Sequence, residues 1–482
     1  MSADAVRDAY DLFVDGEWTP AADGGTFETV DPSTGETLTA VAEGTDADVD
    51  AAVASADAAF EDWAGLSPVE RGRRLSSLAD LLTEHREELA RVETHDQGKP
   101  LSDARDSIDT AARYFEFYAG AADKLHGKTY PRDGAWNSKT IRQPRGISAQ
   151  ITPWNYPITQ LARGTAPALA AGNAVVVKPA EQTPLTALLV AELAVEAGIP
   201  AGVLNVVPGF GPVAGEALVT HTDVDIVTFT GSRETGQHVM EQAAGQITPT
   251  TLELGGKGAA IVFPDADLDN AVESIRTGIY TNAGQSCSAS SRLLVQEELH
   301  DEVLDRLLEG VADLTVGPGM DDHDLGPVTS EGQFEKTVSY VEIGEAEGAS
   351  LVAGGRALDR PGFYVEPTVF DDVTPDMRIA QEEIFGPVLS VMTFADEAEA
   401  IRLANDTKYG LVAGVFTSDH GRVERVTRAV EAGHVYVNDW YAGGVDTPFG
   451  GINESGIGRE KGVQALEHYT NLKTISSGSH RL

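Results

Sequence analysis

Short runs rich in β-branched residues alternate with helix-forming segments from about Ile147 onward, and this alternation constrains the fold more than any other feature. Strands are expected at 174–177, 203–207 and 226–230, with helices at 186–197 and 214–219 between them. The order strand–helix–strand is typical of a parallel sheet covered by helices on both faces. A similar alternation resumes after Gly256, so the sequence predicts an α/β protein with a doubly wound sheet and a second α/β domain.

Two helices are predicted in the region before this alternation. Residues 45–63 form an alanine-rich helical pattern with Thr45 or Asp46 as N-cap. A second helix is expected to follow Pro68 and to continue to about Arg91, with leucines at helical spacing.

The charge balance excludes several classes of partner. The chain has 482 residues, with 35 Lys and Arg against 76 Asp and Glu, and a formal net charge of −41. Such a surface repels phosphate backbones and anionic lipid, so we expect neither nucleic-acid nor membrane binding. Excess carboxylate with few lysines resembles proteins of salt-loving organisms, in which high ionic strength screens the self-repulsion. The alternative is an ordinary acidic enzyme.

Cys287 is the single cysteine, so no disulfide can form within the chain and no thiolate cluster can hold a metal. The N-terminus lacks the apolar segment of a signal peptide, and no run of 18 uninterrupted apolar residues occurs. We therefore expect a soluble, cytoplasmic protein without a metal centre.

Cys287 is also the strongest candidate for chemistry. It ends the run Gly284-Gln285-Ser286-Cys287, which follows a helical stretch. A thiolate in a glycine-containing turn is a candidate nucleophile for a carbonyl carbon. The alternative is an inert buried thiol.

Glu253 is the candidate base. It stands between two leucines and is followed by two glycines, which would let backbone approach a ligand. Desolvation of a carboxyl between apolar side chains raises its pKa and suits it to general-base catalysis near neutral pH. The alternative is a solvated surface carboxylate.

Asn155 lies in a rigid aromatic segment, Pro153-Trp154-Asn155-Tyr156-Pro157. Its amide could donate a hydrogen bond to a developing oxyanion. The alternative is a turn with packed aromatic side chains.

Lys178 and Glu181 stand at the carboxyl end of a predicted strand, where doubly wound sheets bind ligands. They could hold ribose hydroxyls, or they could form a surface ion pair of little energetic value. Ser232 follows another strand, and the helix start behind it could receive a pyrophosphate. The chain has no intact GxGxxG fingerprint.

Together these segments resemble one family. PWNYP, KPAEQTP, FTGS, LELGGK, GQSC, EEIFGP (382–387), PFGG (448–451) and SGIGREKG (455–462) occur in the order and approximate spacing of the aldehyde dehydrogenase superfamily. The resemblance extends from about residue 12 to about residue 475.

The resemblance implies an oxidation that passes through a covalent intermediate. Cys287 would be the nucleophile, and Asn155 with the N–H of the cysteine would stabilise the thiohemiacetal oxyanion. Hydride would pass to a nicotinamide and leave a thioester, and Glu253 would activate the water that hydrolyses it.

The resemblance also implies the cofactor contacts. Lys178 and Glu181 would hold the adenosine ribose, and the charge of Glu181 favours NAD over NADP, although NADP stays possible. The remaining expected contacts are Ser232 near the pyrophosphate, Glu383 at the nicotinamide ribose and Phe385 against the nicotinamide, and Trp154 and Gly231 are also expected to bind the cofactor.

Three structural parts follow from the resemblance, and each has expected boundaries. These are a Rossmann-like NAD-binding domain (1–122 and 145–253), a catalytic α/β domain (254–462) and a β oligomerisation arm (123–144 and 463–482). We expect a homodimer or a homotetramer.

Arg163 carries the substrate prediction. Relatives that act on neutral or quaternary-amine aldehydes commonly have Trp there, whereas Arg resembles succinate-semialdehyde-type enzymes, in which it faces a carboxylate. The alternative is an ion pair with an acidic side chain. Other expected substrate contacts are Gln160, Ser286, Ser288 and Phe449.

The expected substrate is an ω-semialdehyde acid, either succinate semialdehyde or 2,5-dioxopentanoate. Alternatives are a neutral or quaternary-amine aldehyde, or a CoA-acylating relative, which Glu253 argues against. A non-catalytic binding protein is disfavoured because both Cys287 and Glu253 are present.

Overall fold

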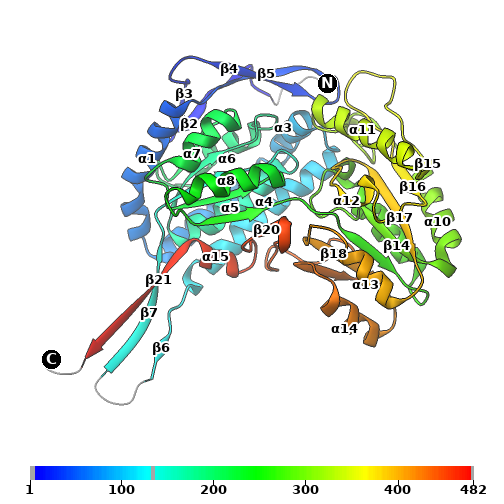
Figure 1. Cartoon of the computed structure of the whole chain (residues 1–482). Coiled ribbons are helices and arrows are strands. Elements are labelled where there is room, and N and C mark those ends of the chain that lie inside the picture. The colour runs from blue at the N-terminus through cyan, green and yellow to red at the C-terminus, as the bar shows by residue number, and fades with distance from the viewer. Residues whose placement is uncertain (1–5, 132–135, 479–482) are drawn as a thin grey trace.

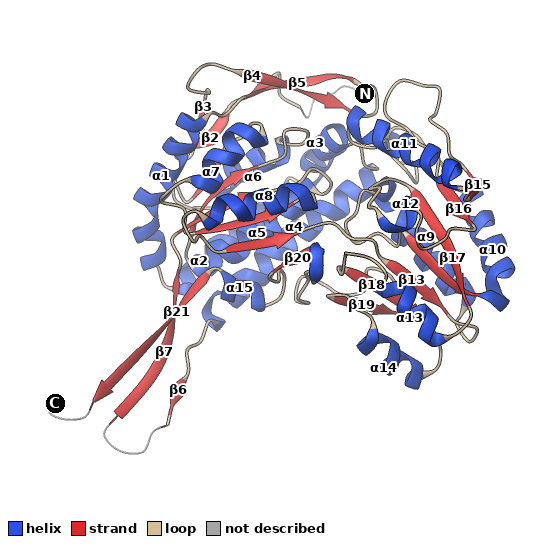
Figure 2. Ribbon diagram, viewed as in Figure 1, coloured by secondary structure: helices blue, strands red, loops and turns tan. Residues whose placement is uncertain are grey.

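Two parallel sheets, each covered by helices, make up most of the molecule, and a narrow three-stranded sheet projects from one of them (Figures 1 and 2). The structure is a computed structural model and describes residues 6–131 and 136–478. Within those residues no helix is long and apolar enough to cross a bilayer.

The first sheet has eight strands in the order β20-β12-β11-β8-β9-β10-β2-β3. Its strands are β2 (Leu12–Val14), β3 (Glu17–Thr19), β8 (Ile147–Ile151), β9 (Ala174–Lys178), β10 (Leu204–Val206), β11 (Ile226–Thr230), β12 (Thr250–Glu253) and β20 (Gly456–Ile457). The five central strands, β12 to β10, are parallel, whereas β20, β2 and β3 are antiparallel to their neighbours. The strand order reverses between β8 and β11, which is where such sheets bind ligands.

Alternating side chains of β9 enter two separate cores. Val175 and Val177 face α2 (Pro68–Glu84), α3 (Arg86–Gln97), α4 (Leu101–Ala121), α5 (Pro157–Ala171) and α6 (Leu185–Glu196). Ala174 and Val176 face α1 (Asp46–Gly65), α7 (Glu216–Thr220) and α8 (Arg233–Ala244). The strands are apolar on both faces because helices cover both.

The second sheet has seven strands in the order β15-β16-β17-β14-β13-β18-β19. They are β13 (Ala259–Val262), β14 (Arg292–Gln296), β15 (Ser350–Ala353), β16 (Thr368–Asp371), β17 (Val388–Phe394), β18 (Val412–Phe416) and β19 (His434–Val437). All are parallel except β15. The covering helices are α9 (Leu268–Tyr280), α10 (His300–Ala312), α11 (Glu331–Glu347), α12 (Arg378–Gln381), α13 (Glu397–Asn405) and α14 (His420–Ala429). The α/β fold predicted from the sequence is therefore correct.

Two smaller sheets complete the chain. One pairs β1 (Ala9–Tyr10), β4 (Thr26–Asp31) and β5 (Glu36–Ala42). The projecting sheet pairs β6 (Thr129–Tyr130), β7 (Trp136–Pro144) and β21 (Thr470–Gly478), which joins strands far apart in sequence (Figure 1).

Three sequence predictions differ from the structure. The helix expected from Pro68 to about Arg91 is two helices that meet at His85, where the backbone leaves the helical conformation (φ −88°, ψ 13°). The helix expected at 214–219 begins as a wider π-helical turn at Gly211–Gly215. The third concerns the expected catalytic domain, 254–462. Within that range the chain has already returned to the first sheet, because β20 pairs with β12.

Candidate active site

The candidate residues lie where the carboxyl edge of the first sheet meets the amino edge of the second. Lys178 and Glu253 end strands β9 and β12 of the first sheet. Cys287 and Phe385 precede strands β14 and β17 of the second sheet. Side chains far apart in sequence therefore converge between the two sheets.

Three cavities meet along this junction. We call the first the outer cavity, which has a volume of about 340 Å³, and the second the junction cavity, which has a volume of about 210 Å³. Cys287, Asn155 and Gln160 line both of them. The cleft, of about 920 Å³, crosses the strand-order reversal of the first sheet. Trp154 lines the cleft and the junction cavity, so the three spaces adjoin.

A strained loop presents Cys287. After α9 the backbone passes through left-handed conformations at Asn282 (φ 52°) and Ala283 (φ 51°). Gly284 follows at φ 73°, and a Cβ there would lie 2.2 Å from the carbonyl oxygen of Gly386. Such strain persists only where the surroundings fix the backbone. Burial raises the pKa of the Cys287 thiol to about 11, so the thiol requires a base before it can attack.

Asn155 is held against the same loop. Its Nδ2 donates a hydrogen bond to the carbonyl oxygen of Gln285 at 2.9 Å, and the Nδ2 of Asn282 donates to the carbonyl oxygen of Asn155 at 2.8 Å. The amide of Asn155 has two N–H groups, so one is left for a ligand in the cavity.

Glu253 is buried at the end of β12, with an exposed fraction of 2%. Neither of its carboxyl oxygens has a hydrogen-bond partner among the described residues. Burial raises its pKa well above the ordinary value. Glu253 lines the junction cavity with Cys287 and Asn155, so a buried carboxyl, a thiol and an amide face one space.

Arg163, on α5, forms an ion pair with Glu460 through its Nε. Burial alone would lower the pKa of the guanidinium, but the carboxylate of Glu460 holds it above its usual value. The Nη2 of Arg163 lies 4.0 Å from Oε2 of Glu253 and has no hydrogen-bond partner in the described chain. Of the two roles considered for Arg163, the structure contains the ion pair with an acidic side chain.

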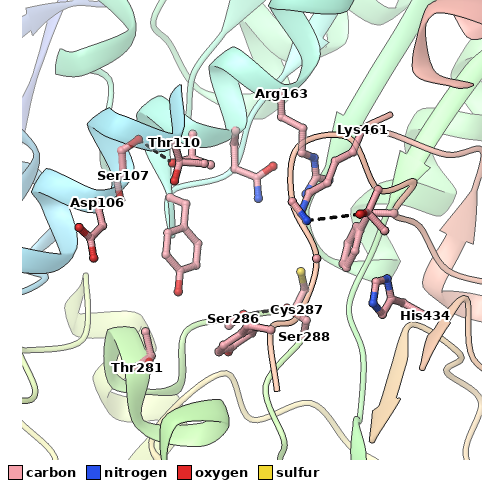
Figure 3. Close-up of a pocket in the computed structure, with 18 of the residues that line it drawn as sticks. Asp106, Ser107, Thr110, Arg163, Thr281, Ser286, Cys287, Ser288, His434 and Lys461 are labelled. Carbon is pink, nitrogen blue, oxygen red and sulfur yellow. Dashed lines mark hydrogen bonds between the residues drawn. The ribbon is translucent and has the colours of Figure 1, made fainter. Parts of the chain in front are cut away.

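The other expected substrate residues line the outer cavity. Gln160, Ser286, Ser288 and Phe449 all face it, and the Oγ atoms of Ser286 and Ser288 lie 3.2 Å apart. Figure 3 shows the sulfur of Cys287 directed into this space, with Arg163 and Lys461 on the same side of it.

The expected cofactor residues in the cleft are Lys178, Glu181, Trp154, Gly231 and Ser232. Lys178 donates from Nζ to the carbonyl oxygens of Pro179 (2.8 Å) and Gly209 (2.7 Å) and lies 3.6 Å from Glu181. Ser232 is the N-cap of α8, and its Oγ accepts from the N–H of Thr235 at 3.2 Å.

Glu383 and Phe385 line the junction cavity. Oε1 of Glu383 accepts from the N–H of Gly256 at 2.9 Å, and a Cβ on Gly255 would lie 2.1 Å from Oε2, so a side chain at 255 would displace the Glu383 carboxylate. Burial raises the pKa of Glu383 to about 6. The ring of Phe385 packs edge-on against Trp154, 5.2 Å between centroids.

Several lining residues were not predicted from the sequence. Asp103 and Asp106 of α4, His434 of β19 and Lys461 line the outer cavity, and Lys336 lines the junction cavity. Only Lys461 carried a signal, because it lies inside the segment SGIGREKG; the others have no local pattern. In residues 6–131 and 136–478 no group of three or more His, Cys, Asp or Glu residues could hold a metal ion.

Comparisons with known proteins give one consistent result. The family model described as "Aldehyde dehydrogenase family" matches residues 18–475. An aldehyde dehydrogenase of Aspergillus niger is 46% identical over 96% of this chain and 94% of its own length. A mitochondrial aldehyde dehydrogenase of Rattus norvegicus is 46% identical over 96% of this chain and 91% of its own.

Solved structures agree with the sequence comparisons. An aldehyde dehydrogenase of Bacillus cereus, in complex with NAD+, has a TM-score of 0.96 at 44% identity and covers 98% of this chain and 96% of that one. A betaine aldehyde dehydrogenase of Staphylococcus aureus, also in complex with NAD+, has a TM-score of 0.96 at 41% identity and covers 98% of this chain and 95% of that one.

Proposed function

Because this chain belongs to the aldehyde dehydrogenase family, we propose that it oxidises an aldehyde to the carboxylic acid with NAD as hydride acceptor. One observation carries the proposal: Cys287, Asn155 and Glu253 line a single cavity that opens onto the cleft. Nucleophile, oxyanion donor and base are the three protein groups that this oxidation needs.

The first step adds the thiol to the aldehyde. Glu253 takes the proton of the Cys287 thiol, and the sulfur attacks the carbonyl carbon and forms a C–S bond. The carbonyl electron pair moves to oxygen, where the free N–H of Asn155 and the backbone N–H of Cys287 donate hydrogen bonds to the oxyanion. The product is a thiohemiacetal.

The second step releases the acid. NAD+ held in the cleft would supply the acceptor for the hydride that leaves the tetrahedral carbon, and a thioester would remain on Cys287. Glu253 releases to solvent the proton that it took from the thiol, and then removes a proton from water, whose oxygen attacks the thioester carbon. The C–S bond breaks, the acid leaves, and the Cys287 thiolate takes back a proton from Glu253. CoA would replace water in an acylating enzyme, so acyl-CoA formation would contradict this step.

The cleft fits a dinucleotide. It lies at the carboxyl edge of a parallel sheet, where the strand order reverses, and it contains the N-terminus of α8 for a pyrophosphate. Lys178 and Glu181 would hold ribose hydroxyls, and the Glu181 carboxylate would repel a 2′-phosphate. We therefore propose NAD rather than NADP.

The test is NADH formation with purified enzyme and an aldehyde. We expect NADH with NAD+ and slower formation of NADPH with NADP+. Glu181→Gln should raise the relative use of NADP+ about tenfold, because it removes the repulsion between two anions. Absence of activity with both cofactors would overturn the proposed function.

We propose an ω-semialdehyde acid, such as succinate semialdehyde or 2,5-dioxopentanoate, as the substrate. The support is that Lys461 and Arg163 line the outer cavity with Cys287, although Arg163 is already paired with Glu460. We expect a kcat/KM advantage of ~100-fold, or about 2.7 kcal/mol, over a neutral aldehyde of equal length. Equal values would remove this substrate class and leave the dehydrogenase intact.

A second candidate is a quaternary-amine aldehyde. Asp103 and Asp106, on α4, line the same cavity, and Figure 3 shows Asp106 on the side opposite Lys461. Burial raises the pKa of Asp103 to about 6, and its charge at neutral pH could receive a cation. A kcat/KM that favours betaine aldehyde over both acids would select this candidate.

The projecting sheet suggests self-association. Trp136 and Leu472, on β7 and β21, have exposed fractions of 63% and 57%, which is unusual for large apolar side chains. We propose that this sheet joins copies of the chain into a dimer or a tetramer. Light scattering should give a multiple of 51.0 kDa, and a monomeric mass would contradict the proposal.

The charge suggests a saline environment. We propose that the net charge of −41 is an adaptation to high salt, in which repulsion between carboxylates is screened. The melting temperature and the activity should rise as KCl is raised to molar concentrations. An unchanged melting temperature in low-salt buffer would contradict this adaptation.

A further inference from the structure

Lys461 places an ammonium group in the outer cavity. It lines this cavity together with Cys287 and Arg163, as Figure 3 shows. Its Nζ lies 5.0 Å from the ring centroid of Phe449. In residues 6–131 and 136–478 no carboxylate forms an ion pair with it, whereas Arg163 is paired with Glu460. The charge of Lys461 is therefore available to a ligand, whereas the charge of Arg163 is already balanced by Glu460.

The backbone holds Lys461 in an uncommon conformation. Its φ is 59°, in the left-handed region that side chains other than glycine seldom adopt. The neighbours on both sides are anchored: Glu460 and Phe449 exchange two backbone hydrogen bonds of 2.8 Å, and the N–H of Gly462 donates to Val445 at 2.9 Å. Strain of this kind is maintained by the surrounding structure and is concentrated at ligand sites.

The charged and titratable groups around Lys461 come from several elements. Burial, followed by the positive charge of Arg163, lowers the pKa of Lys461 to about 8, so the amine is still mostly charged at neutral pH. The groups that act on it or respond to it are Arg163 on α5, Glu253 on β12, Cys287, His434 on β19 and the adjacent Glu460. Glu460 is committed to Arg163, and burial raises the pKa of Glu253.

We propose that Lys461, and not Arg163, binds the substrate carboxylate and so determines specificity for an acid semialdehyde. The inference rests on the proposed aldehyde oxidation and names the residue that selects the substrate. A buried carboxylate needs a cation whose charge is not already neutralised, because desolvation is costly without a partner. Cys287 and Lys461 line the same cavity, so an acid semialdehyde with its aldehyde carbon at Cys287 would place its carboxylate near Lys461.

The test compares succinate semialdehyde with butanal in four proteins: the wild type, Lys461→Met, Lys461→Arg and Lys124→Met. Lys124 is an exposed lysine outside the cavity and serves as the matched control. Lys461→Met should lower the acid-to-neutral ratio of kcat/KM about 30-fold or more, mainly through KM. Lys461→Arg and Lys124→Met should keep most of the preference.

The pH dependence of KM gives a second readout, which a purely structural role would not move. In the wild type, KM for succinate semialdehyde should rise above about pH 8 as Lys461 loses its proton, and KM for butanal should not. In Lys461→Arg the rise should disappear because guanidinium stays charged. A wild-type KM for the acid that is flat to pH 10 would overturn the proposal.

Failure of this inference and failure of the proposed function give different results. A wild type that prefers the acid, with the same preference in a folded Lys461→Met, overturns the role of Lys461 and leaves the function standing. A wild type that prefers butanal overturns both the substrate class and the role of Lys461. A wild type that forms no NADH from any aldehyde overturns the proposed function itself.

Discussion

The two parallel sheets have the same architecture but use opposite edges. In the first sheet the functional groups follow the strands, as with Lys178 after β9 and Glu253 at the end of β12. In the second sheet they precede the strands, as with Cys287 before β14 and His434 at the start of β19. Only the first sheet obeys the rule that ligands bind at carboxyl ends.

The carboxyl edge of the second sheet, which holds none of the candidate residues, differs from the junction in its hydrogen bonding. Beyond the carboxyl ends of β13 and β18, Asp265 accepts hydrogen bonds from Thr417 and Ser418 and forms an ion pair with Arg422. Its carboxylate is thus fully engaged. At the junction, in contrast, both carboxyl oxygens of Glu253 lack partners in the described chain. Polar side chains that are fully hydrogen-bonded to one another have no group free for a ligand. A buried polar side chain without a partner is available to bind or to react.

The strongest test of this comparison is to remove the proposed nucleophile at the amino edge of the second sheet. Cys287→Ser should lower kcat by about 10⁴-fold or more, because a serine hydroxyl is a far weaker nucleophile. Steady-state NADH formation measures the loss. NAD+ binding, followed by fluorescence, should persist and would show an intact cleft. Unchanged turnover would refute the covalent mechanism.

Glu253→Gln removes the proposed base at the carboxyl edge of the first sheet and should give the next largest effect. We expect thioester hydrolysis to fall roughly 10²–10⁴-fold, since the amide cannot take a proton from water. Rapid-mixing experiments with the variant show whether acylation still gives a burst of NADH before the slow phase. Wild-type steady-state turnover in a folded Glu253→Gln protein would contradict the assigned role.

The pH profile tests both edges together. Burial raises the pKa of Cys287 to about 11 and that of Glu253 above its ordinary value, and the proposed mechanism requires both groups in the deprotonated form. With a neutral aldehyde, which does not depend on Lys461, kcat/KM should therefore rise with pH by up to ~10-fold per unit across the neutral range. A profile that falls from pH 6 to 8 would have the wrong sign.

The smallest effect on activity is expected at the carboxyl edge of the second sheet. Asp265→Asn replaces one carboxylate oxygen, which accepts hydrogen bonds, with an NH2 group and removes the negative charge opposite Arg422. The change should lower the free energy of unfolding by about 1–2 kcal/mol. Because this edge is separate from the cavities, kcat should stay within about twofold of wild type. Urea unfolding and steady-state kinetics on one preparation distinguish the two quantities.

The sequence predicted the first sheet well because its strands carry local signals. The apolar runs at 174–177 and 226–230 lie within β9 and β11. The break at His85 was missed because no glycine or proline marks it.

The residues of the site also differ in whether a local sequence pattern marks them. Cys287, Glu253 and Asn155 stand in motifs that local chemistry makes recognisable, and the structure brings them to one cavity. The partner of Arg163 could not be predicted, because Glu460 is 297 positions away and the chain offers many carboxylates. Asp106 and His434 have no local pattern either, because their place in the cavity depends on how helices and sheets pack.

The closing segment of the chain ties the projecting sheet to the chemistry. One short stretch runs from β20 through Glu460 and Lys461 to α15 (Gln464–His468) and on into β21. Tyr118 and Asn173 fasten it to the first core through the carbonyl oxygens of Gly462 and Tyr469. Deleting residues from β21 back toward β20 would therefore disturb Glu460 and Lys461 in the outer cavity as well as remove part of the projecting sheet.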